Sequence, residues 1–98
     1  MKKTKYIIKS TNKFEKEYRR IVKGNLVLGK RIVDVITQLN VDPFYTGLKT
    51  HSVNISGLGK VYSSRVTGDV RIVWCFEGEY ILILQRIGGH SGGSNIYR

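Results

Sequence analysis

Three consecutive segments within residues 60–87 have the composition of β-strands, and this feature limits the possible folds more than any other. They read KVYSSRV (60–66), VRIVWCF (70–76) and YILILQRI (80–87), rich in Val, Ile, Tyr, Phe and Trp. The tripeptides TGD and EGE between them contain residues typical of turns. Because short turns join antiparallel neighbours, this half of the chain predicts a three-stranded antiparallel meander.

The first half of the chain predicts a strand followed by a helical hairpin. KYIIKS is a short strand candidate, and apolar residues recur at helical spacing in STNKFEKEYRRIVKG and GKRIVDVITQLN. Asn12 with Glu15 resembles a capping box, and Gly24 can end the first helix. The apolar stripes expected to face the core are Phe14, Tyr18, Ile21 and Val22 in the first helix and Ile32, Val35, Ile36 and Leu39 in the second.

Residues 41–60 contain a proline, three glycines and scattered polar residues, so we expect a loop there. A chain of 98 residues predicts one domain, spanning 1–98. Its class is α+β, with the N-terminal strand and the αα-hairpin packed on an antiparallel sheet of about four strands. No apolar run reaches the ~20 residues that a membrane span needs. The single cysteine, Cys75, fits a reducing compartment, and we expect a cytoplasmic protein.

Positive charge is concentrated at the N-terminal end. Residues 1–31 contain 11 of the 17 Lys and Arg residues and two of the 7 acids, a local net charge of +9, whereas the remainder carries +1. The net charge of +10 predicts a polyanionic partner, either nucleic acid or an acidic protein. A solvated helical face is the alternative interpretation of such a run.

The hairpin around TGD brings two arginines together. If Gly68 supplies the left-handed conformation of a three-residue turn, Arg65 lies opposite Arg71 and the even-numbered apolar residues of both strands face the helices. A two-residue turn would separate the like charges but would point Arg65 into the apolar face. We prefer the first register, in which the two arginines can clamp a phosphate. Alternatively, one of them is neutralised by Asp69, Glu77 or Glu79.

The chain has two histidines, and both are candidate site residues. His90 follows the last predicted strand, at the end of the sheet where Arg65 and Arg71 are expected, with Tyr97 in the tail that follows. Beside two arginines an imidazole stays neutral near pH 7 and can exchange a proton. His51 precedes the meander and either reaches the same cleft or caps a loop. One cysteine and two histidines do not furnish a structural zinc site.

The order of these segments resembles a known family. A basic helical hairpin precedes GLKTHSV, LGKVYSSRV, TGDVRIVWCF and the closing ILILQRIGGHSGGSNIYR, which is similar to the RelE/YafQ-type toxins of bacterial type II toxin–antitoxin systems. The likeness runs roughly from Lys5 onward and is strongest over residues 48–98. It implies a RelE-like microbial RNase fold and a ribosome-dependent mRNA endonuclease that needs no metal or cofactor and is neutralised by a cognate antitoxin.

The resemblance also implies roles in RNA cleavage by attack of a 2′-hydroxyl on the adjacent phosphate. Arg71 would stabilise the transition-state charge with help from Arg65, and His90 would be the general acid. His51 would act as base or position the nucleotide, and Tyr97 would stack on it. The sequence departs from the family pattern in two ways: SGGSNI lengthens the gap between His90 and Tyr97, and residues 43–60 contain no carboxylate.

Under the nuclease interpretation, the basic helices are expected to contact ribosomal RNA. Two other functions fit the outline, a gyrase poison of the ParE type and a non-catalytic RNA-binding module. The presence of both histidines with Arg71 favours the nuclease. The residues expected to contact RNA or the ribosome are Lys13, Lys16, Arg19, Arg20, Lys23, Lys49 and Lys60.

Overall fold

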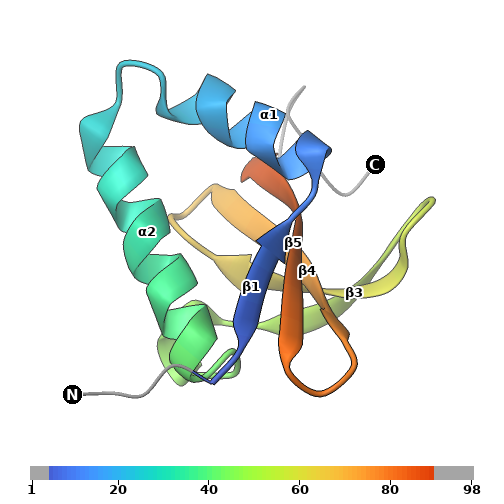
Figure 1. Ribbon diagram of the computed structural model, residues 1–98. Helices are drawn as coiled ribbons and strands as arrows, with labels where there is room; N and C mark the ends of the chain where they lie inside the picture. The colour runs from blue at the N-terminus through green and yellow to red at the C-terminus, as the bar shows by residue number, and fades with distance from the viewer. Residues whose placement is uncertain (1–4, 90–98) are drawn as a thin grey trace.

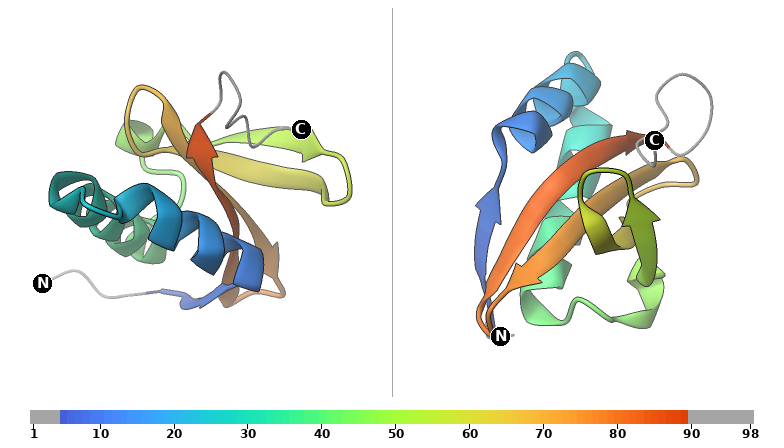
Figure 2. Two further views of the ribbon diagram at one scale, coloured as in Figure 1. Left: turned by 90° about the horizontal axis from the view of Figure 1, so that it is seen from above. Right: turned by 90° about the vertical axis from the view of Figure 1, so that its right-hand side faces the viewer.

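A computed structural model describes residues 5–89, which form a twisted sheet with two helices on one side (Figure 1). The turned views in Figure 2 show both helices on the same side of the sheet, with the β2–β3 hairpin extending away from them. The elements are β1 (Ile7–Ser10), α1 (Asn12–Val22), α2 (Leu26–Val41), the 3₁₀ turn η1 (Thr46–Leu48), β2 (His51–Ile55), β3 (Gly59–Arg65), β4 (Val70–Glu77) and β5 (Ile81–Gly89).

The sheet confirms the predicted meander and adds to it. Its strand order is β1-β5-β4-β3-β2, in which β2 to β5 are antiparallel neighbours and β1 runs parallel to β5. The sheet is therefore mixed and has five strands rather than about four. Residues 51–55, expected to be loop, pair with β3 because Gly57 and Gly59 turn the chain with positive φ angles of 87° and 74°.

Two side-chain caps begin the helices. The hydroxyl of Thr11 accepts a hydrogen bond from Phe14 N–H at 3.1 Å and donates to the Gln85 carbonyl at 3.0 Å. Thr11 therefore caps α1, whereas we expected Asn12 to do so. Asn25 caps α2 by accepting from Leu28 N–H at 3.0 Å, which starts that helix before the expected Gly29. Neither helix in the described range has the length and apolarity needed to cross a membrane.

The main core lies between the helices and the sheet. The predicted apolar stripes of both helices contribute to it, so this expectation is confirmed. Its buried residues are Phe14, Ile32, Val35, Leu39, Leu48, Val66, Ile72, Trp74, Leu82, Leu84 and Ile87.

A hydrogen-bonded chain ties the loop after α2 to this core. Trp74 Nε1 donates to Ser64 Oγ at 2.8 Å, and Thr50 Oγ1 donates to the Pro43 carbonyl at 2.6 Å. The two hydroxyl oxygens are 2.7 Å apart, and since each has one proton, Ser64 must donate to Thr50. The chain of bonds fixes residues 43–50, and with them the positions of Lys49 and His51.

The opposite face of the sheet carries a smaller cluster of Ile55, Val61 and Val73, with Val53 and Cys75 packed against it. This sorting of residues between the two faces confirms the predicted hairpin register. It leaves the odd-numbered positions of β3 and β4 on the face away from the helices, where the candidate site residues lie.

Candidate functional site

Arg65 and Arg71 are directly opposed on neighbouring strands, as predicted. Like charges at such positions repel, and the β3–β4 turn compensates with backbone carbonyls. Arg65 Nε donates to Thr67 O at 3.2 Å, and Arg71 Nη1 donates to the same oxygen at 2.5 Å. Arg71 also donates to Val70 O and to Gly68 O, each at 3.2 Å. The turn therefore holds two guanidinium groups side by side.

The turn reaches this shape by a different route from the one expected. Gly68 does not have the left-handed conformation that we predicted, since the positive-φ glycines in the described range are elsewhere. Instead the Thr67 hydroxyl accepts hydrogen bonds from Asp69 N–H at 3.3 Å and Val70 N–H at 3.0 Å. A threonine side chain can thus replace a glycine in forming a tight turn.

Two of the three acids considered as neutralising partners are remote from the arginine pair. Glu77 is the last residue of β4, six positions beyond Arg71, and Glu79 lies in the turn that follows. The side-chain ion pairs measured within residues 5–89 join Glu15 to Arg19 at 4.0 Å and Glu17 to Arg86 at 2.8 Å. Neither pair involves the arginines at the β3–β4 turn.

His51 lies on the same face as the arginine pair. It begins β2, and its partner on β3 is Ser63, two residues before Arg65. Cross-strand partners point to one face, and diagonal neighbours are ~7–8 Å apart, within reach of long side chains. The imidazole is exposed, with Nδ1 3.2 Å from the Lys49 carbonyl. Because a carbonyl only accepts, this hydrogen bond exists in the tautomer that carries its proton on Nδ1.

The two remaining catalytic candidates, His90 and Tyr97, lie outside the described residues. The described chain ends in β5 with Gly88 opposite Arg71 and Gly89 opposite Val70. The strand therefore ends beside the β3–β4 turn.

The predicted basic residues divide into three places. Lys13, Lys16, Arg19, Arg20 and Lys23 are all exposed on or just after α1. Lys49 lies next to the arginine pair, because it lines the same cavity as Arg65. Lys60 does not join them: it is near the start of β3, and strand alternation puts it on the face opposite to Arg65.

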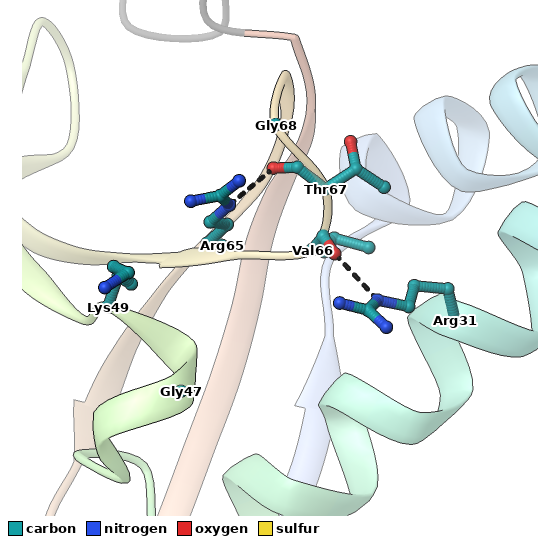
Figure 3. A pocket seen from close by; sticks show the side chains of 7 residues that line it. All are labelled: Arg31, Gly47, Lys49, Arg65, Val66, Thr67 and Gly68. Atoms are coloured by element: carbon teal, nitrogen blue, oxygen red, sulfur yellow. Dashed lines mark hydrogen bonds between the residues drawn. The ribbon is translucent and has the colours of Figure 1, made fainter.

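A basic cavity of about 410 Å³ adjoins the arginine pair (Figure 3). Arg31 from α2, Lys49 and Arg65 line it, and Arg31 Nε donates to Val66 O at 3.0 Å. Arg31 was not among the site residues predicted from the sequence. Nothing in the local pattern marks it, because its place beside β3 depends on how α2 packs on the sheet.

The partners of Glu17 were likewise not predicted from the sequence. This buried carboxylate accepts from Arg86 Nε at 3.0 Å, from Arg86 Nη2 at 2.8 Å and from Ile87 N–H at 3.1 Å. The pair joins α1 to β5 just before the strand reaches the arginines. The sequence offered one signal of a buried ion pair, which is that the acidic Glu17 lies within a strongly basic helix. Within residues 5–89, no three His, Cys, Asp or Glu side chains are grouped to hold a metal ion.

Comparisons with solved structures identify the fold. No protein-family model and no curated protein sequence matches the chain. The YoeB/ParE toxin from Agrobacterium tumefaciens aligns with a TM-score of 0.73 and 20% identity, covering 93% of this chain and 100% of the toxin. RelE in the archaeal RelE–RelB complex from Pyrococcus horikoshii aligns with a TM-score of 0.69 and 15% identity. The alignment covers 89% of this chain and 97% of the matched chain.

YafQ in the Escherichia coli DinJ–YafQ toxin–antitoxin complex aligns at a TM-score of 0.62 and 17% identity, over 88% of this chain and 93% of the matched chain. These alignments cover almost the whole of each chain, and they confirm the expected fold. The protein thus matches the RelE, YafQ, YoeB and ParE toxins structurally and has the RelE-like α+β fold.

Proposed function

We propose that this protein is the toxin of a type II toxin–antitoxin system and that it cleaves mRNA on the ribosome. The observation that carries the proposal is the group on the exposed face of the sheet: Arg65 and Arg71, held by the carbonyl of Thr67, with His51 as a diagonal neighbour. The match to toxins of this fold supports the biological context.

Arg71 is proposed to stabilise the charge that develops on the phosphate. A guanidinium has five N–H donors, and the three hydrogen bonds to the turn use three of them. None of these three hydrogen bonds uses the other two N–H groups, so they can donate to phosphate oxygens. Because the carbonyls already orient the group, little reorganisation is needed when the transition-state charge forms.

Proton transfer is assigned to the histidines. With its proton on Nδ1 facing the Lys49 carbonyl, neutral His51 presents Nε2 as an acceptor for the proton of the attacking 2′-hydroxyl. His90 follows Gly89 directly in sequence and is proposed to protonate the leaving 5′-oxygen. The attack forms a bond from the 2′-oxygen to phosphorus and breaks the bond to the 5′-oxygen, giving a 2′,3′-cyclic phosphate. Tyr97 is proposed to stack on the nucleotide.

The antitoxin is proposed to cover an apolar groove along the helices. Tyr18 of α1 and Val33 of α2 line two adjoining hollows in the protein surface. The second hollow is also lined by Val22 and Leu26. Leu26 and Val33 are 90% and 54% exposed, a poor arrangement for large apolar side chains in an isolated protein. The YafQ of similar fold was crystallised in a toxin–antitoxin complex. An amphipathic helix from the antitoxin would bury these side chains.

Primer extension on mRNA from an in vitro translation reaction tests the nuclease. Wild-type protein is expected to produce cuts at codon-defined positions, and Arg71→Ala and His90→Ala to remove them by at least a hundredfold, the loss typical of a transition-state donor or a general acid. Lys5→Ala, which removes an exposed charge away from this face, is the control and should cut normally.

Two other results would identify the alternative functions. Inhibition of DNA supercoiling without mRNA cuts would indicate a gyrase poison of the ParE type. RNA binding with neither effect would indicate a passive binding module. A short acidic protein encoded in the neighbouring reading frame would be the expected antitoxin.

A further inference from the structure

The cavity beside the arginine pair is lined by cations from three different elements (Figure 3). Arg31 comes from α2, Lys49 follows η1, and Arg65 is the last residue of β3. The other described residues that line it are Gly47, Val66, Thr67 and Gly68, so residues 5–89 contribute no carboxylate to the wall.

Both arginines of the cavity are oriented by backbone carbonyls. Arg31 Nε donates to Val66 O at 3.0 Å, and Arg65 Nε donates to Thr67 O at 3.2 Å. Because each bond uses the Nε–H, the terminal Nη groups stay available as donors. Figure 3 shows the Arg31 guanidinium extending from α2 toward the space below β3. The donors are therefore preorganised before any ligand binds.

Lys49 reaches the cavity at a conformational cost. Its φ of 52° is in the left-handed region, and it is the sole non-glycine residue within 5–89 with a positive φ. Glycine would adopt this conformation freely, whereas a residue with a Cβ is strained there. The chain thus places an ammonium group at a position where a glycine would be the more stable choice.

No ion pair within residues 5–89 joins these three cations to an acidic side chain. The ion pairs measured in the described part of the chain join other residues, and none includes Arg31, Lys49 or Arg65. Confining three like charges around one cavity is electrostatically unfavourable until an anion enters it. The cavity also adjoins the proposed active site, because Arg65 lines the cavity and shares the acceptor Thr67 O with Arg71.

We infer that this cavity binds a phosphodiester group of the RNA strand adjacent to the scissile phosphate, with Arg31 and Lys49 as its binding residues. The inference rests on the proposed function. An RNA backbone fits two adjoining cationic sites, because it carries a negative charge at every nucleotide and would place one phosphate at Arg71 and a neighbouring one in the cavity. The planar guanidinium groups provide paired donors for its oxygens.

Binding of a 2′-O-methyl pentanucleotide, which lacks the attacking hydroxyl, tests this inference. Arg31→Gln and Lys49→Gly should each weaken binding about tenfold, the effect of losing one charge-assisted hydrogen bond. Each should also lower the slope of log K against log salt, by at most ~0.7, which is the value for losing one whole phosphate contact on a single strand. Lys49→Gly is informative because glycine suits the backbone, so the loss of affinity would not reflect unfolding.

The matched control is Lys30→Gln, which removes the same charge from the neighbouring exposed position of α2 and should change affinity by less than about twofold, as expected for a screened surface charge. Equal effects of Arg31→Gln and Lys30→Gln would overturn the inference. So would binding of a hexaglutamate peptide with the same dependence on Arg31 and no binding of the oligonucleotide. If wild-type protein does not cut mRNA but the oligonucleotide data are as expected, the phosphate site stands and the proposed nuclease fails.

Discussion

Removal of the Glu17 carboxylate should strongly destabilise this protein. This carboxylate is enclosed with the Arg86 guanidinium, their side chains being 9% and 15% exposed. Breaking a buried pair leaves an uncompensated charge, so Glu17→Ala should lower the free energy of unfolding by about 3–5 kcal/mol. Urea denaturation measures this loss.

Glu15→Ala is the matched control, because Glu15 is on the same helix but its 4.0 Å pair with Arg19 is exposed to solvent. The Glu15→Ala variant should lower the free energy of unfolding by less than about 1 kcal/mol. A double variant, Glu17→Met with Arg86→Met, should recover much of the stability lost by Glu17→Ala, since it leaves no buried charge. Equal losses for Glu15→Ala and Glu17→Ala would contradict this account of the pair.

At the scale of elements, the groove along α1 and α2 is the proposed docking surface for the antitoxin. Val33 lines both hollows of the groove, whereas Val27, which is 83% exposed on the same helix, lines neither. Val33→Asp should weaken binding of the antitoxin by at least thirtyfold, about 2 kcal/mol for a central contact. Titration calorimetry measures the affinity, and Val27→Asp should leave it nearly unchanged. Similar losses in the two variants would exclude this groove.

At the scale of the whole molecule, the exposed basic residues of α1 are proposed to meet ribosomal RNA. Reversing Lys13, Lys16 and Arg20 to glutamate should weaken cosedimentation with ribosomes at least tenfold at physiological salt, because several phosphate contacts are lost together. Reversal of Lys5, Lys9 and Lys30 produces the same change in net charge elsewhere on the surface and should have a smaller effect. Undiminished ribosome binding by the α1 variant, with its fold intact by circular dichroism, would count against the assignment.

The sequence by itself determined the features that repeat within one continuous segment. Alternation along residues 60–87 predicted the meander, the two faces of the hairpin and the opposition of Arg65 and Arg71, because every second strand residue faces the same way. Helical spacing predicted both apolar stripes for the same reason. The predicted register of the β3–β4 hairpin also placed Arg65 and Arg71 on the face of the sheet away from the helices.

Tertiary structure decided everything that joins segments far apart in the chain. The edge strand β2, the parallel pairing of β1 with β5, the Glu17–Arg86 pair and the approach of Arg31 to the β3–β4 turn all depend on how preformed elements pack. No local periodicity encodes such contacts, because they bring together residues whose separation along the chain has no fixed relation to their distance in space.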